Sequence, residues 1–364
     1  QSMRIKENSR EWEMRDSMGY SLPYNPQELL LIYSLKSHNT LTSNRIETYL
    51  QDTWRFKSNI GLFNLNYGIR ISHWDWNRET LISPRVSIGL LPKNDKLSLR
   101  FATGIYYQAP FYKELRDTTF IGGMATAKLN KDIKSQRSLQ FIAGMDYYYN
   151  FLRHPFKLSV EVYYKHLNNI NPYAVDNMKI TYMGRNDAHG YAAGLDVKLF
   201  GEMVPGVDSW LGFSLMRTME SVVGENNKYV PRPTDQLYNI SLFFQDYIPG
   251  LPQYRVHVLF NWAQGLPVRA PGAIQSSSNL RAPDYRRVDL GVSRVFEKGK
   301  DPWMGRGFFK PFKEILIAFE VLNLFGFNNV NSYYWVSTIA SDAQYAVPNY
   351  LTGRQFNLKL QFKF

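Results

Sequence analysis

Histidine is the residue type in this 364-residue chain with the most versatile chemistry, because it exchanges protons near neutral pH and binds metals. Two histidines four residues apart on a helix, or a His-Glu-x-x-His motif, would predict a metal site. The six histidines follow neither spacing; they are His38, His73, His154, His166, His189 and His257. The sequence also has no cysteine, no Gly-x-Ser-x-Gly elbow and no glycine-rich phosphate loop. We therefore expect no catalytic residue, no metal site and no cofactor, and predict that the protein is not an enzyme.

The charge balance is basic, with 43 Lys and Arg against 31 Asp and Glu, which gives a formal net charge of +12. These cations are spread along the whole chain and form no run of five or more, so the sequence does not predict a nucleic-acid partner. Aromatic residues make up 15% of the chain, which excludes intrinsic disorder. The apolar runs are too short or too interrupted for bilayer-spanning helices.

Hydrophobic residues recur with period 2 along nearly the whole chain, which is typical of strands with two different faces. In 59–76, for example, Phe63, Leu65 and Tyr67 alternate with Asn64 and Asn66. The predicted strands are 42–56, 59–76, 82–91, 96–108, 136–152, 155–168, 190–201, 208–220, 235–246, 253–264, 285–296, 313–324 and 355–364. The fold class is therefore all-β.

These strands are long, at about 9–11 residues or more, which is the length that a tilted strand needs to cross a bilayer. Aromatic residues such as Trp54, Trp74 and Trp262 lie near strand ends, where a membrane interface favours them. A large soluble sandwich is the alternative, but strands of soluble domains usually have 5–6 residues. We therefore predict a transmembrane antiparallel β-barrel.

The connections support this prediction because short and long ones alternate, as periplasmic turns and external loops do in outer-membrane barrels. The long ones are 73–82, 109–135, 168–190, 220–234, 265–284 and 325–352, and 297–312 is unusually long for a turn on the short side. The alternation gives about thirteen crossings and places residues 1–41 outside the cell. Because bacterial barrels have even strand numbers, the chain is expected to be part of a larger barrel or one of two pieces that close together.

Several segments resemble the C-terminal barrel region of TonB-dependent outer-membrane receptors of the Bacteroidota type. They are 49–54 (YLQDTW), 83–87 (SPRVS), 106–115 (YYQAPFYKEL), 232–236 (RPTDQ), 319–325 (FEVLNLF) and 353–364 (GRQFNLKLQFKF). The resemblance implies a barrel of 22 strands that encloses a plug domain. It also implies active import of scarce ligands, such as iron chelates, cobalamin, glycans or peptides, with energy relayed by TonB.

Two parts of the chain are expected on this basis. Residues 1–41 are an extracellular loop segment, and 42–364 are the C-terminal portion of the outer-membrane barrel, without the N-terminal strands, the plug or the TonB box. The last strand resembles the signal that the barrel-assembly machinery reads. Its outward, lipid-facing side chains are Phe356, Leu358, Leu360, Phe362 and Phe364.

Two groups of side chains are candidates for ligand binding. The inward positions of the strands carry mostly cations, which would bind an anionic ligand or pair with a plug; they are Arg70, Arg85, Arg100, Lys157, Glu161, Lys165 and Arg255. Long connections carry aromatic residues that would stack on a ligand, or pack the loops together; they are Phe111, Tyr112, Tyr173, Tyr182, Tyr333, Tyr334 and Trp335.

The sequence thus predicts outer-membrane active transport. One alternative is a passive channel of about 14 strands, with an additional crossing in 1–41, and another is a structural half-barrel subunit of an outer-membrane complex. Expected partners are outer-membrane lipid and lipopolysaccharide, which basic surface residues would bind, together with a plug domain, TonB and a surface lipoprotein.

Overall fold

A computed structural model describes residues 1–15, 30–121, 124–151, 153–176, 179–204, 206–224, 228–269, 280–338 and 341–364. Strands dominate these residues, and the short helical segments are two 3₁₀ turns, η3 (Pro302–Gly305) and η4 (Gly307–Phe309). No helix in the described ranges combines the length and the apolar character that crossing a bilayer requires.

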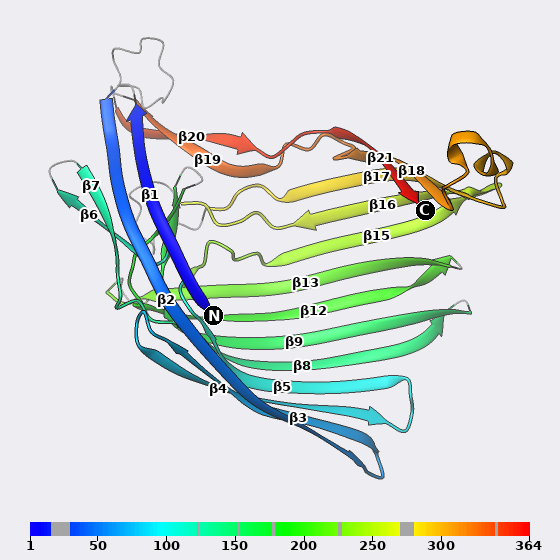
Figure 1. Cartoon of the computed structure of the whole chain (residues 1–364), viewed down its shortest axis with the longest axis horizontal. Coiled ribbons are helices and arrows are strands. Elements are labelled where there is room, and N and C mark those ends of the chain that lie inside the picture. Colours follow the sequence, from blue (N-terminus) through cyan, green and yellow to red (C-terminus); the bar gives the residue numbers. More distant parts are fainter. Residues whose placement is uncertain are drawn as a thin grey trace.

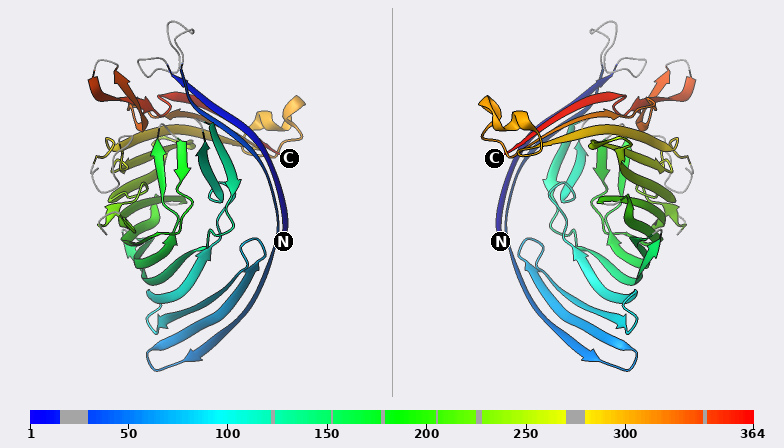
Figure 2. Two further views of the ribbon diagram at one scale, coloured as in Figure 1. Left: turned by 90° about the vertical axis from the view of Figure 1, so that its left-hand side faces the viewer. Right: turned by 90° about the vertical axis from the view of Figure 1, so that its right-hand side faces the viewer.

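Fourteen strands of the described residues pair in succession to form one curved antiparallel sheet (Figure 1). They are β1 (Ser2–Arg15), β2 (Leu30–Lys57), β3 (Gly61–Trp74), β4 (Glu79–Pro92), β5 (Leu97–Gln108), β8 (Gln136–Phe151), β9 (His154–Ile170), β12 (Ala188–Val204), β13 (Val207–Val222), β15 (Tyr238–Ile248), β16 (Leu251–Ala263), β17 (Tyr285–Glu297), β18 (Glu314–Leu322) and β21 (Gln355–Lys363). Viewed along the strands, this wall curves around a central space (Figure 2). The described residues contain no ladder between β1 and β21.

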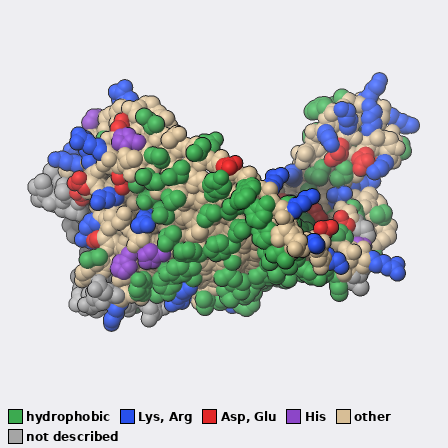
Figure 3. Space-filling view, turned by 90° about the horizontal axis from the view of Figure 1, so that it is seen from below, with side chains coloured by type: hydrophobic (Ala, Val, Ile, Leu, Met, Phe, Trp, Pro, Cys, Tyr) green, Lys and Arg blue, Asp and Glu red, His purple; other side chains and the backbone are tan. Residues whose placement is uncertain are grey.

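The two faces of the wall differ as the alternating sequence predicts. On β21, Phe356, Leu358 and Leu360 alternate with Asn357 and Lys359, so apolar and polar side chains point to opposite faces. Hydrophobic side chains form a broad belt across the outer surface, with charged residues gathered toward the two ends (Figure 3). A wall that exposes apolar side chains along its middle fits lipid rather than water.

The thirteen predicted strands are all present, with ends shifted by a few residues, except that the first of them, β2, begins at Leu30 rather than at 42. One further strand, β1, pairs with residues 30–44 of β2, so the segment 1–41 contains β-structure in its described parts. The connection 73–82 was expected to be long, but β3 and β4 extend toward each other and leave only residues 75–78 between them. The external location of 1–41 remains a prediction.

Small hairpins fill the rim where the long connections lie, called here the long-loop rim. They are formed by β6 (Arg116–Ile121) with β7 (Met124–Leu129), by β10 (Tyr173–Asp176) with β11 (Lys179–Tyr182), and by β19 (Val330–Thr338) with β20 (Ser341–Tyr350). A two-residue strand, β14 (Val230–Pro231), pairs with β13. The opposite end, where the turns are short, is called the short-turn rim.

The main buried cluster lies where the connection between β5 and β8 packs on the inner side of β2. Its buried members are Leu41, Trp74, Leu115 and Ile133, with Met3 and Ile5 of β1 packed against them. This apolar packing holds the long connection against the wall, which positions the aromatic residues of the connection at the long-loop rim.

Candidate functional site

The inner face of the wall carries a charged cluster nearer the short-turn rim than the long-loop rim. Arg100 lies between two acidic partners, with its Nη1 atom 2.9 Å from Asp146 Oδ2 and its Nη2 atom 3.3 Å from Glu161 Oε2. Lys157 Nζ lies 3.1 Å from the same Asp146 oxygen, and Ser159 Oγ donates a hydrogen bond to Asp146 Oδ1. The structure therefore brings together three of the seven predicted inward charges, around an aspartate that the sequence analysis did not select.

A glycine makes room for this cluster. Gly144 lies directly opposite both Arg100 and Glu161 in the strand register. A Cβ atom at position 144 would lie 2.6 Å from Arg100 Nε, which is closer than atoms in contact can approach. The missing side chain thus lets the guanidinium lie across β8 and reach Glu161 on β9.

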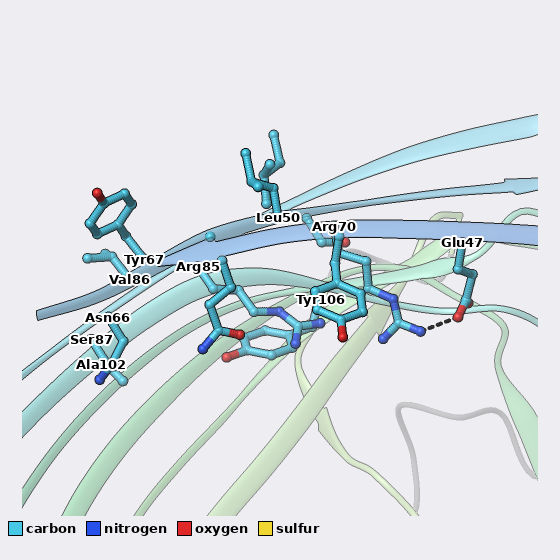
Figure 4. A pocket seen from close by; sticks show the side chains of 15 residues that line it. Glu47, Leu50, Asn66, Tyr67, Arg70, Arg85, Val86, Ser87, Ala102 and Tyr106 are labelled. Atoms are coloured by element: carbon cyan, nitrogen blue, oxygen red, sulfur yellow. Dashed lines mark hydrogen bonds and ion pairs between the residues drawn. The ribbon is translucent and has the colours of Figure 1, made fainter. Parts of the chain in front are cut away.

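Arg70 and Arg85 border a cavity of about 570 Å³ along β2, β3, β4 and β5. Arg70 forms an ion pair with Glu47, and the Arg85 guanidinium lies 4.4 Å from the centre of the Tyr106 ring. Arg70, Arg85 and Tyr106 lie on the same side of the ribbons (Figure 4). The lining also contains Tyr49 and Tyr67, together with serine hydroxyls, amides and apolar side chains.

Lys165 and Arg255, the remaining predicted charges, belong to neither group. Lys165 Nζ lies 5.0 Å from the Tyr163 ring centre, and Arg255 Cζ lies 5.2 Å from the Tyr247 ring centre. Each makes a local cation–π contact with a neighbouring tyrosine. Their predicted contact with a ligand or a plug stays a prediction.

A second cavity, of about 400 Å³, lies nearer the long-loop rim. Its aromatic wall contains Phe111, Tyr173 and Tyr182, with the Tyr182 ring centre 5.4 Å from that of Phe111 and 5.7 Å from that of Tyr173. Arg232 also lines it, and its Nε atom donates a 3.0 Å hydrogen bond to Glu220. Two of these rings come from the β10–β11 hairpin, so the hairpin brings them to the loop that carries Phe111.

Glu114 gives this second cavity a buried carboxyl group, with only 3% of the residue exposed. The backbone N–H of Phe111 and the Gln136 side-chain amide each donate a 3.1 Å hydrogen bond to it. Burial raises the pKa of Glu114 above the usual carboxyl value, and these hydrogen bonds only partly oppose that effect. Glu114 therefore takes up a proton more readily than an exposed glutamate.

A third cavity, of about 290 Å³, lies between the connection before β17 and the β19–β20 hairpin. Tyr333 and Trp335 line it, with ring centres 6.4 Å apart, and Tyr173 forms part of its wall as well. Tyr334, between them on β19, is 47% exposed and is not among the lining residues. Alternation along the strand thus separates Tyr334 from its two neighbours.

The three cavities adjoin one another through shared residues. Tyr106 lines both the first and the second, and Tyr173 lines both the second and the third. A continuous series of aromatic and polar surfaces therefore extends from the long-loop rim down the inner face. We take this series as the candidate site.

Tyr112, another predicted loop aromatic, contacts the wall instead of a cavity. Its hydroxyl donates a 2.6 Å hydrogen bond to Glu7 of β1. The sequence left two roles open for the loop aromatics, stacking on a ligand or packing the loops. Tyr112 has the second role. In the described ranges, no three His, Asp or Glu side chains gather as a metal site.

An antiparallel wall of long strands, with an apolar outer belt and a polar inner face that leads into aromatic cavities, defines a bilayer-spanning β-barrel protein. The family model described as "TonB dependent receptor-like, beta-barrel" matches residues 6–324. The chain belongs to this family of outer-membrane receptors and transporters, whose members work with TonB and a plug domain.

Solved structures of similar fold agree with the family. The outer-membrane transporter YddB from Escherichia coli aligns with a TM-score of 0.64 at 13% identity, over 100% of this chain and 50% of its own. The pyoverdine receptor FpvA from Pseudomonas aeruginosa, bound to pyoverdine, aligns with a TM-score of 0.58 at 15% identity, over 90% of this chain and 43% of its own. The siderophore receptor PiuA from Acinetobacter baumannii aligns with a TM-score of 0.60 at 12% identity, over 100% of this chain and 52% of its own.

This chain thus spans about half the length of the solved receptors that it resembles. A search of curated proteins finds no matching relative. The family and the outer-membrane location are shown by the match, whereas the Bacteroidota type remains a prediction.

Proposed function

We propose that this chain forms the C-terminal barrel part of an active outer-membrane transporter, residues 42–364 supplying most of the wall. The whole receptor takes up a scarce ligand, such as a siderophore, vitamin, glycan or peptide, with a plug domain and TonB. The observation that carries the proposal is the series of adjoining cavities, joined at Tyr106 and Tyr173, on the inner side of a receptor-family wall.

The cavities favour a ligand with planar or ring-shaped groups, which stack on aromatic faces. Arg85 in the first cavity adds positive charge for an anionic group, whereas Arg232 in the second is already paired with Glu220. Arg100 and Lys157 already have acidic partners on the wall, so we do not assign them to the ligand, and their inward cluster is left to face the plug. No catalytic step is proposed for any of these residues.

Other expected partners belong to the same proposal. Basic residues at the long-loop rim would bind lipopolysaccharide phosphates, and a surface lipoprotein would contact the loops. The barrel-assembly machinery would recognise the terminal strand with Phe356, Leu358, Leu360, Phe362 and Phe364. The exposure of these five side chains on one edge strand supports the last assignment.

The test is uptake by cells that produce the full-length receptor, compared with cells that lack the receptor gene or the tonB gene. The probes are labelled ferric siderophores, cobalamin, oligosaccharides and peptides, each supplied alone. We expect one class of probe to require both genes. Uptake that requires the receptor but not TonB would instead establish a passive channel, and no uptake of any probe would favour the half-barrel subunit.

Variants locate the site within the receptor. Tyr106→Ala and Tyr173→Ala each remove an aromatic face shared by two cavities, so we expect about 3- to 10-fold weaker ligand binding. Tyr334→Ala removes the same kind of side chain from an exposed position that lines none of the three cavities, so it is the matched control. Equal effects of all three variants would contradict the proposed site.

A further inference from the structure

One connection at the short-turn rim is much longer than the others. Sixteen residues, 298–313, separate β17 from β18, whereas at most four, 93–96, separate the other described strand pairs at this rim. This segment, called here the 298–313 turn, contains η3 and η4. It projects beyond the strand ends (orange in Figure 1).

The 298–313 turn folds against the outer face of the wall. Met304 is fully buried, and Phe312 is 7% exposed, in a cluster with Ile315 and the partly buried Phe296. Phe296 and Ile315 are paired in register with Phe362, so they belong to the outward-facing set. The turn is therefore fixed on the side of the wall that faces lipid.

Aromatic contacts join the turn to the lipid-facing surface. The Phe312 ring centre lies 5.1 Å from that of Phe362 and 4.9 Å from that of Phe364. Phe308 contacts Phe312 at 5.7 Å but is itself 76% exposed. Trp303 is 38% exposed, and its ring centre lies 4.8 Å from that of Phe309. The apolar belt of the wall thus continues without a break onto exposed rings of the turn.

The same turn is strongly basic. It contains five cations and one acidic residue, Asp301. Lys298 donates to the Lys310 carbonyl and Lys300 pairs with Glu297, so these two have local partners. The side chains of Arg306, Lys310 and Lys313 are exposed, and the described contacts give them no hydrogen bond or ion pair.

We propose that the 298–313 turn binds anionic phospholipid headgroups in the leaflet at the short-turn rim. Phe308 and Trp303 enter the interface between headgroups and acyl chains, where aromatic side chains are most favourable. Arg306, Lys310 and Lys313 bind the lipid phosphates. Continuity with the lipid-facing belt favours a lipid over a protein, because the exposed rings start where the membrane surface must lie.

The test uses the full-length receptor in a neutral detergent, titrated with phosphatidylglycerol or with phosphatidylcholine and measured by native mass spectrometry. A basic residue near an anionic membrane contributes about 1 kcal/mol, or about fivefold in affinity. We therefore expect the double variant Arg306→Gln with Lys310→Gln to bind phosphatidylglycerol about 20-fold more weakly. Its binding of phosphatidylcholine should not change.

The double variant Lys93→Gln with Lys96→Gln is the matched control, because it removes the same charge from an exposed turn at the same rim. We expect this control to change phosphatidylglycerol binding less than twofold. A second variant, Phe308→Ser, should weaken the binding of both lipids roughly tenfold, because it removes a ring buried in the interface.

Three outcomes would overturn the proposal. One is equal loss of phosphatidylglycerol binding in the two double variants, which would indicate a general effect of charge. Another is equal affinity of the unaltered receptor for the two lipids. A third is the loss of a co-purifying polypeptide from the Arg306→Gln and Lys310→Gln receptor with unchanged lipid binding, which would assign the surface to a protein.

Discussion

The hydroxyl of Tyr112 donates a 2.6 Å hydrogen bond to Glu7 Oε2, which joins the connection after β5 to β1 across 105 residues of sequence. Ser37 Oγ donates to the same oxygen at 2.6 Å, and Arg116 Nη1 lies 3.4 Å from Glu7 Oε1. Burial and the bond to Glu7 raise the pKa of Tyr112 well above its usual value, so its phenol remains a donor at every physiological pH. Glu7 thereby fixes the loop that carries Phe111 and Glu114 to the site.

The variant Tyr112→Phe should loosen this loop without unfolding the wall. A hydrogen bond to a charged group contributes about 1.5–3 kcal/mol, but Ser37 and Arg116 remain as partners of Glu7, so we expect the lower end of that range. The amides of Glu114, Leu115 and Arg116 bond to carbonyls within the loop, and their hydrogen exchange should become roughly tenfold faster. Mass spectrometry of the exchanged receptor measures this.

Tyr334→Phe is the control for this prediction, because it removes the same hydroxyl from an exposed position. It should leave exchange in residues 111–116 unchanged. Faster exchange throughout β1 and β2 in Tyr112→Phe would contradict a purely local effect.

The strands could be predicted because one face of each had to meet lipid, and that requirement leaves an alternating pattern. β1 was not predicted since its inward face carries Glu7 and Glu11, whose partner Arg116 lies more than 100 residues away. A strand stabilised by distant ion pairs has no hydrophobic alternation to detect. The hairpins β6–β7 and β10–β11 were missed for another reason. Their strands are only four to six residues long and lie within connections of the long-loop rim.

Gly144 and Arg100 give a second prediction. Gly144→Ala should displace the Arg100 guanidinium and so separate it from Asp146 and Glu161. Because Arg100 is partly exposed, each of Gly144→Ala and Arg100→Gln should lower the free energy of unfolding by only about 1 kcal/mol. The combined variant should lose about the same free energy of unfolding as either single variant. Gly144→Ala already breaks the ion pairs of Arg100 that Arg100→Gln would remove.

Denaturant unfolding of the full-length receptor in micelles measures these free energies. Gly89→Ala is the control, because a Cβ atom on that inward-facing glycine would have no neighbour closer than 3.9 Å. Additive losses in the combined variant would show that Gly144 and Arg100 act independently.

The candidate site was only half predictable for a geometric reason. Alternation gave the side of the strand on which Arg100 and Lys157 lie, but not the register that sets both beside Asp146. Likewise, Phe111 and Tyr182 were recognised as loop aromatics, whereas their 5.4 Å contact depends on how the β10–β11 hairpin folds back. Register and loop packing arise from tertiary contacts that a single sequence does not display.

Glu114 gives a prediction about pH. Its pKa is raised in the folded protein, so the folded state binds a proton more readily than the unfolded chain, whose glutamates titrate near about 4.3. The stability of the loop should therefore increase as pH falls through the folded pKa and decrease as pH rises through it. Exchange protection of residues 111–116, corrected for intrinsic rates, should be greater at pH 5 than at pH 7.5.

Glu114→Gln should abolish this pH dependence, because its amide does not titrate. The variant retains an oxygen that can accept one of the two hydrogen bonds made by the Phe111 amide and Gln136. If protection in Glu114→Gln still increases toward pH 5, another group is responsible.

The terminal ring leads to the last prediction. Phe364 is 71% exposed yet lies 4.9 Å from Phe312, so it could act either as an assembly signal or as a packing contact for the 298–313 turn. If the assembly machinery recognises it, Phe364→Ser should reduce folded receptor in the outer membrane several-fold, whereas Phe312→Ala should not. Folded receptor is counted by its faster migration in unheated gels, with Lys363→Gln as a neighbouring control. Equal losses in Phe364→Ser and Phe312→Ala would mean that packing of the two rings, rather than recognition of the terminus, limits assembly.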